Sequence, residues 1–209
     1  MRVTATPRRR LFALGAGALA AGCLRRTPPP VRRFYLTALA EPPPDVPSAS
    51  WSLVVPPPET VAALRTTRIA QALGANEFDF YADAEWGDIP PLMFQAVLIR
   101  SFERTGAIPV VVDQRARVRT DFILNGTLVP FFAVGAVGTP PTARVGFDAR
   151  LVRSRGREVV ASRSFEERRE AESADVAAVV AAFDAAARAV MAALVPWTVT
   201  AGNTAGTGA

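Results

Sequence analysis

Short apolar runs and alternating apolar and polar positions divide the middle of the chain into strand-like segments. These segments are rich in Val, Ile, Leu and Phe and are bounded by Pro, Gly and Asp, a combination that favours strands. The predicted strands are residues 33–39, 51–55, 68–72, 77–81, 108–113, 122–134, 144–153 and 157–167. Turn residues at 74–76 and 153–156 predict that two neighbouring pairs form hairpins. The pattern therefore indicates a sheet of six or more strands.

A helical spacing of apolar residues follows the first predicted hairpin. Pro90 and Pro91 suit the first turn of a helix, and Gly106 suits its C-terminal cap. The residues predicted to share the buried face are Leu92, Ala96, Ile99 and Phe102, widened by Met93 and Val97.

A second helix is predicted after the last strand. Ser173 is a candidate cap, Asp175 suits the first turn, and Pro196 is expected to stop the helix. Its narrow, Ala-rich apolar stripe favours packing on a sheet; a partner-binding or membrane-lying helix is the alternative, but the outer face has no basic belt. The predicted fold is α/β, a mixed β-sheet with helices packed against it in a single domain.

The N-terminal residues have the three regions of an export signal. Arg8, Arg9 and Arg10 precede an apolar run, residues 11–22, which is too short to span a bilayer as a helix. Residues 20–23, Ala-Ala-Gly-Cys, resemble a lipobox, which would make Cys23 the lipidated first residue of the mature protein. The alternative is a plain signal peptide followed by a free or buried Cys23. Arg9 to Phe12 also resembles a twin-arginine signal, and Sec export remains open.

These observations predict four parts of the chain. They are a signal peptide (1–22), a lipidated Cys with a Pro-rich tether (23–32), one domain (33–197) and a disordered tail (198–209). Residue 24 is Leu rather than Asp. By the resemblance to bacterial lipoproteins, this favours attachment to the periplasmic face of the outer membrane.

Charge and composition exclude several classes of function. The chain has 24 basic residues, all of them Arg, with 19 acidic residues and no His. Four of the arginines precede Cys23, so 20 basic and 19 acidic residues remain, for a net charge of about +1, which does not favour nucleic acid. A single Cys excludes an intrachain disulfide, and the lack of His excludes Ser-His-Asp catalysis. We expect no metal site and no cofactor.

One cluster of carboxylates could carry chemistry. The cluster holds Glu77, Asp79, Asp83, Glu85 and Asp88. It could form an acid–base pair or a calcium loop, although it lacks the turn Gly and closing Glu of an EF-hand. A solvated strand edge is the favoured interpretation, and a carboxylate hydrolase using Asp83 and Glu85 is the remaining enzymatic alternative.

Several segments in order resemble one family. They are Cys23, Phe34 to Leu39 (FYLTAL), the strand ending LVVPPP, the run Arg68-Ile69…Tyr81…Trp86, and Asp121 to Phe131 (DFILNGTLVPF). Together they resemble an ABC-type transport auxiliary lipoprotein of the paraquat-inducible protein C type, over roughly residues 23–195. Trp86 falls in the predicted loop before the first helix, where a core position and an interface position are both open.

The resemblance implies a non-enzymatic part of an ABC-type intermembrane lipid transport system. The implied partner is a protein of the mammalian-cell-entry (MCE) type, with Arg68, Tyr81 and Trp86 as the candidate partner-binding residues. A ring-like homo-oligomer is compatible with the same resemblance. The alternative function is an envelope-assembly lipoprotein that binds an outer-membrane β-barrel.

Overall fold

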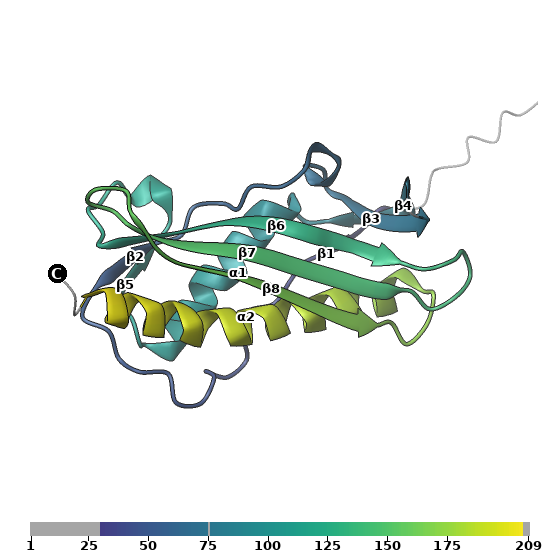
Figure 1. The fold of residues 1–209 in the computed structure, drawn as a ribbon. Helices are drawn as coiled ribbons and strands as arrows, with labels where there is room; N and C mark the ends of the chain where they lie inside the picture. Colours follow the sequence, from purple (N-terminus) through teal and green to yellow (C-terminus); the bar gives the residue numbers. More distant parts are fainter. Residues whose placement is uncertain (1–29, 75, 207–209) are drawn as a thin grey trace, which may run out of the picture.

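A computed structural model describes residues 30–74 and 76–206 of the chain. In this part of the chain a mixed sheet of eight strands carries two α-helices, which confirms the predicted fold class (Figure 1). The strands are β1 (Arg32–Phe34), β2 (Ser52–Val54), β3 (Arg68–Gly74), β4 (Glu77–Trp86), β5 (Val110–Val112), β6 (Phe122–Val134), β7 (Thr142–Arg153) and β8 (Val159–Glu170). The helices are α1 (Pro90–Thr105) and α2 (Val176–Gly206), with short 3-10 turns η1 (Ala62–Leu64) and η2 (Gln114–Ala116).

Strand β6 is the centre of the sheet. One side of β6 pairs antiparallel with β7, which pairs antiparallel with β8. Its other side is shared, because β2 runs parallel to its start and β3 runs parallel to its end. Strand β4 pairs antiparallel with β3 and parallel with β1, whereas β5 pairs parallel with β2.

This topology gives the domain two opposite ends. The hairpin end holds Gly74 and Glu77 of the β3–β4 hairpin, Val134 at the end of β6, and Val176 at the start of α2. The cavity end holds Phe122, Arg153 and Gly206, the matching opposite ends of β6, β7 and α2. Figure 1 shows the hairpin end on the right and the cavity end on the left.

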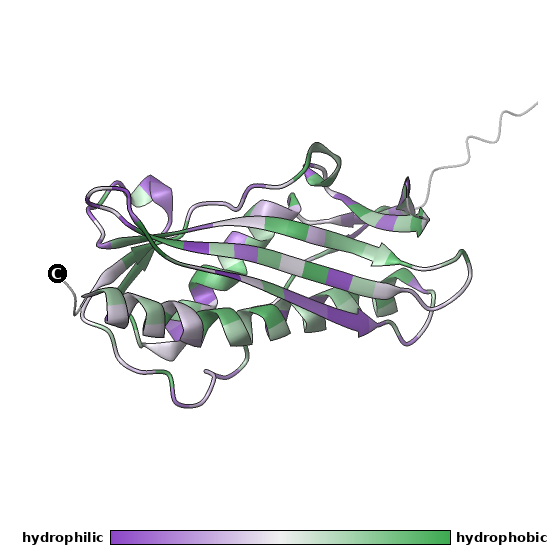
Figure 2. Ribbon diagram, in the orientation of Figure 1, coloured by the Kyte–Doolittle hydropathy of each residue, from purple (hydrophilic) through white to green (hydrophobic). Residues whose placement is uncertain are grey.

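Helix α2 lies along one face of the β6–β7–β8 region and closes the core. Strand residues alternate between the two faces, so β7 buries Val145, Phe147 and Ala149 while Asp148 and Arg150 face solvent. Figure 2 shows hydrophilic residues gathered toward the end of β8. Helix α2 is long and apolar enough to cross a membrane by length and composition, but 56% of its most apolar window is buried inside the domain. It is therefore a core helix here.

Helix α1 has the predicted bounds but a different buried face. Gly106 caps it in the left-handed conformation, with φ of 60°. Phe94 and Leu98 are buried, whereas Leu92 is 37% exposed. The prediction holds for Met93 and Phe102, which are buried, and is wrong for Leu92 and Ala96, which are exposed. Ser101 belongs to the buried stripe instead, and its hydroxyl accepts the N–H of Leu39. Because this buried residue is polar, the apolar spacing in the sequence indicated a neighbouring face of the helix.

The predicted end of α2 is also wrong. The helix continues through Pro196 to Gly206, so residues 198–206, predicted as a disordered tail, are helical. Thr198 and Val199 are buried against the sheet. At the start of the helix the cap is Asp175 rather than Ser173, since Asp175 Oδ1 accepts the N–H of Ala177 at 3.2 Å.

Two strand predictions need correction. The segment 33–39 forms a strand only at Arg32–Phe34, and the chain beyond it binds to helices. The carboxylate of Asp184 in α2 accepts the N–H of Thr37, and Arg104 of α1 donates a hydrogen bond to the carbonyl of Leu39. Strand β4 is longer than predicted and ends at Trp86, which is a strand residue rather than a loop residue.

Candidate functional site

The three predicted partner-binding residues lie in the β3–β4 hairpin, but they do not share one surface. Arg68 is exposed, and its guanidinium lies 4.0 Å from the ring centre of Phe80. Such an arginine over an aromatic ring is a cation–π contact. It leaves Arg68 accessible to a partner.

Tyr81 and Trp86 lie deeper. Tyr81 is half-buried, and this burial raises the pKa of its phenol above the usual value. Trp86 is 1% exposed, with its ring centre 5.6 Å from that of Phe131 and 5.4 Å from that of Phe183. A partner has no direct access to the Trp86 ring in this structure. The predicted lipidation site, Cys23, lies outside the described residues.

The residues of the carboxylate cluster lie along β4 and in the loop after it. Asp83 is exposed and has a left-handed backbone, with φ of 54°, at the point where β3 and β4 shift register. Glu85 is half-buried and pairs across the ladder with Arg68. Within residues 30–74 and 76–206, no group of three or more His, Cys, Asp or Glu side chains could hold a metal ion.

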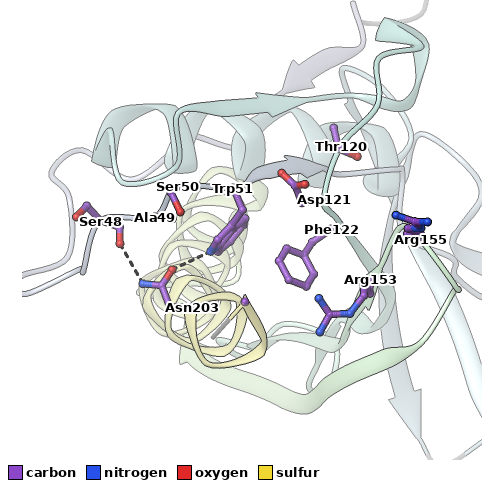
Figure 3. Close-up of a pocket in the computed structure, with 11 residues that line it drawn as sticks. Ser48, Ala49, Ser50, Trp51, Thr120, Asp121, Phe122, Arg153, Arg155 and Asn203 are labelled. Carbon is purple, nitrogen blue, oxygen red and sulfur yellow. Dashed lines mark hydrogen bonds between the residues drawn. The ribbon is translucent and has the colours of Figure 1, made fainter. Parts of the chain in front are cut away.

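A cavity of about 900 Å³ opens at the cavity end (Figure 3). Its volume lies within the range of about 300–1,000 Å³ that is usual for ligand sites. The lining comes from the loop before β2, the start of β6, the β7–β8 turn and the last turn of α2. These lining residues are 48–51 and 120–122, with Arg153, Arg155, Asn203 and Gly206.

The apolar wall of the cavity is aromatic. Trp51 and Phe122 meet edge to face, with ring centres 5.1 Å apart. Asn203 fixes one side of this wall, because it accepts a hydrogen bond from the Trp51 indole and donates one to the Ser48 carbonyl. Figure 3 shows these two bonds and places Phe122 between Asp121 and Arg153.

Charged side chains rim the cavity. Arg153 Nη2 donates to the Ala205 carbonyl at 2.9 Å, and its guanidinium lies 5.6 Å from the Phe122 ring. A cation in this place also neutralises the negative C-terminal end of α2. Asp121 Oδ2 accepts both the N–H and the hydroxyl of Ser52, at 2.8 and 2.7 Å. Both groups are therefore held in place by the fold.

Arg155 differs from these two charges. It is exposed in the β7–β8 turn, and no hydrogen bond or ion pair joins it to another residue of the described chain. The cavity thus offers an aromatic wall and one uncommitted cation, a combination suited to binding an apolar side chain beside a carboxylate. One sequence signal points to this site, since Asp121 and Phe122 begin one of the motifs that carry the family resemblance.

Comparison with family models identifies one family. A family model described as "ABC-type transport auxiliary lipoprotein component" matches residues 34–195. The chain is 36% identical over 155 residues to an uncharacterized protein, bll6063, of Bradyrhizobium diazoefficiens. That match covers 73% of this chain and 40% of the relative, so the chain spans about two fifths of the relative's length.

Solved structures resemble the fold. Protein XCC0632 from Xanthomonas campestris is 30% identical, with a TM-score of 0.78 over 84% of this chain and 99% of that chain. A second structure, of an uncharacterized protein, has a TM-score of 0.60 at 12% identity and covers 79% of this chain and 97% of its own. At that identity the second likeness concerns the fold alone.

Proposed function

Because this chain belongs to the family of ABC-type transport auxiliary lipoprotein components, we propose that it is a non-catalytic accessory of an ABC-type intermembrane lipid transport system. In this proposal Cys23 carries the lipid and the domain stands at the periplasmic face of the outer membrane. Its partner is an MCE-type protein of the same system. Neither a cofactor nor a metal takes part.

One observation carries the proposal: the chain enters the domain at one end and the cavity opens at the other. Strand β1 runs parallel to β4, with Arg32 opposite Ala84, so the chain enters the domain from the hairpin end. The cavity lies at the other end of α2. With 31 residues, α2 is about 46 Å long. A lipid on Cys23 would therefore leave the cavity end free to face the periplasm.

The cavity end supplies the proposed partner contacts. Arg155 would bind a carboxylate of the partner, and the wall of Trp51 and Phe122 would receive an adjacent apolar side chain. Arg68 is exposed and stays a proposed second contact. Confinement near the membrane raises the effective concentration of the domain, so a modest contact area is sufficient.

Metabolic labelling tests the anchor. Cells expressing the wild-type chain and Cys23→Ala are grown with a labelled fatty acid, and the fractionated envelope is analysed. We expect label on the wild-type protein in the outer-membrane fraction and none on Cys23→Ala. An unlabelled wild-type protein in the soluble periplasm would contradict the proposal.

Affinity purification tests the partner. We expect an MCE-type protein to co-purify with the wild-type chain and to be reduced by Arg155→Glu. The matched control is Arg150→Glu, an equal charge change at an exposed position of β7 away from the cavity. Equal loss with both variants would argue against the cavity as the contact. Capture of an outer-membrane β-barrel in place of the MCE protein would favour the envelope-assembly alternative.

Light scattering of the purified protein tests the homo-oligomer, which stays a prediction.

A further inference from the structure

Apolar side chains are exposed together at the hairpin end. We call this set, Phe78, Phe132, Val134 and Val137, the hairpin-end patch. Phe78 is 43% exposed, Val134 is 38% exposed and Val137 is 82% exposed. The rings of Phe78 and Phe132 meet edge to face with centres 5.0 Å apart. Contiguous exposed apolar side chains, unlike apolar residues scattered singly, point to a surface that contacts another molecule or a membrane.

The sheet register places Phe78, Phe132 and Val134 on one face, and Val137 lies in the loop that follows β6. Ala72 pairs with Phe78 on one side and with Val134 on the other, and residues directly opposite in a ladder point to the same face. Because side chains alternate along a strand, Glu77 and Asp79 point to the face opposite Phe78. The acidic residues next to Phe78 in the sequence are thus turned away from the patch.

Arginines border the patch on the same face. The Arg144 guanidinium lies 5.7 Å from the Phe132 ring centre, and the Arg68 guanidinium lies 4.0 Å from the ring centre of Phe80, two residues after Phe78. Arg144 is bonded to Glu166, so Arg68 is the arginine that can reach the head groups. Apolar groups beside such an arginine suit the boundary between acyl chains and phosphate head groups.

The length of chain between the anchor and the domain identifies what meets this patch. Pro30 is seven residues after Cys23, and seven extended residues span at most about 25 Å. The chain enters β1 from the hairpin end, so this end stays within that reach of a lipid attached to Cys23. Arg25, Arg26 and Arg33 lie in this entry region, and no acidic residue lies between Cys23 and Phe34, which favours anionic head groups. Arg32 is paired with Asp175 at 3.7 Å and is not counted among them.

We propose that the hairpin-end patch lies against the bilayer to which Cys23 attaches the chain, with Phe78, Val134 and Val137 in the interfacial layer. The inference rests on the proposed function, since the lipid on Cys23 holds the patch near the surface. Two attachments, one covalent and one through the patch, orient the domain. The domain then projects from the bilayer with the cavity end outermost.

Site-specific fluorescence tests the contact. The acylated full-length chain is reconstituted in vesicles of phosphatidylethanolamine and phosphatidylglycerol. Because acylation occupies the only native thiol, Val137→Cys introduces a single site for an environment-sensitive dye. Val159→Cys is the matched control, an exposed valine (54%) at the start of β8, near the cavity end. We expect nitroxide-labelled lipid to quench the dye at position 137 several-fold more than at position 159.

A second substitution tests the patch itself. Phe78→Ser should remove most of the quenching at position 137, whereas Val134→Ile, which keeps the patch apolar, should retain it. Equal quenching at positions 137 and 159, or none at either, would overturn the proposal. A change in dye fluorescence at position 137 when unlabelled protein is added without lipid would also overturn it, because the patch would then be a protein interface.

The mass spectrum of the same sample separates the two proposals. An unacylated Cys23 would contradict the proposed anchor. In that case the quenching at positions 137 and 159 is measured in a Cys23→Ser background with the same vesicles, which tests membrane contact by the patch independently of the anchor. Stronger quenching at position 137 supports the contact, and equal quenching overturns it.

Discussion

The indole Nε1 of Trp51 donates a 2.8 Å hydrogen bond to Oδ1 of Asn203, so the loop before β2 is tied to the end of α2. Gly202 lies directly against the same indole, where an added Cβ would come within 2.2 Å of the ring. The last turns of α2 contain Gly, Asn and Thr, which are weak helix formers. Their helical structure therefore depends on packing against Trp51.

Replacing Gly202 with Ala should loosen this end of the helix. The new methyl group collides with a buried ring that has little room to move, and overpacking of this kind costs about 1–3 kcal/mol of unfolding free energy. Chemical denaturation would measure the loss, and hydrogen exchange should show faster exchange at the end of α2. Gly206→Ala is the control, because no atom lies within 4 Å of its added Cβ. Equal stability of the two variants would contradict the role given to Trp51.

The same contact explains which parts of the fold could be predicted from the sequence. Strand β6 and the β3–β4 hairpin follow from local signals, a continuous apolar run and a Gly-Ala-Asn turn. The end of α2 does not, because Pro196 and the Gly-Asn-Thr composition locally oppose a helix. Tertiary packing of Thr198, Val199 and Gly202 overrides them.

The candidate site was predictable only in part for a similar reason. Asp121 and Phe122 belong to a segment that the family resemblance singles out, but nothing local relates them to Asn203 or Arg155. These residues meet because β6, the β7–β8 turn and α2 all end at the cavity end. A contact made by chain ends far apart in the sequence leaves no periodic signal.

Asp184 is expected to hold the segment after β1. Its carboxylate accepts the N–H and the hydroxyl of Thr37, the former at 2.6 Å, and lies 3.2 Å from Nε of Arg188. Asp184→Ala leaves the two Thr37 donors without their acceptor and removes the ion pair with Arg188, which should lower the unfolding free energy by about 1–3 kcal/mol. Thermal and chemical unfolding would measure the loss. Asp148→Ala, at an exposed position of β7, should change stability by less than about 0.5 kcal/mol. A smaller loss for Asp184→Ala than for Asp148→Ala would refute this account.

Trp86 is expected to act through the core rather than by touching a partner. Trp86→Ala removes a ring packed between Phe131 and Phe183 and should cost about 3–5 kcal/mol of stability. Trp86→Phe keeps an aromatic ring and should cost less. Partner capture, measured at a temperature where both variants are folded, should stay near the wild-type level. Loss of capture by a well-folded Trp86→Phe would show that the indole itself contacts the partner.

Glu166 should make the stability of the sheet depend on pH. Hydrogen bonds from Arg144 and from Arg168 lower the pKa of the Glu166 carboxyl below its usual value. A carboxyl whose pKa is lower in the folded state stabilises the fold above its unfolded pKa, which is about 4.3. This contribution is lost as the pH falls through the lower, folded pKa. Because the side chain is 36% exposed and screened by solvent, the contribution should stay below about 1 kcal/mol.

The comparison of Glu166→Gln with wild type isolates that contribution. At pH 7 the variant lacks the carboxylate charge that strengthens the hydrogen bonds from Arg144 and Arg168, so it should be less stable. At pH 3 the wild-type carboxyl is closer to neutral, so the gap between the two proteins should narrow. Glu170→Gln, at an exposed position on the same strand, is the control and should give a small gap at both values. Urea unfolding at each pH measures these differences. A gap that widens on acidification would mean that Arg144 and Arg168 do not favour the charged form of Glu166 in the folded sheet.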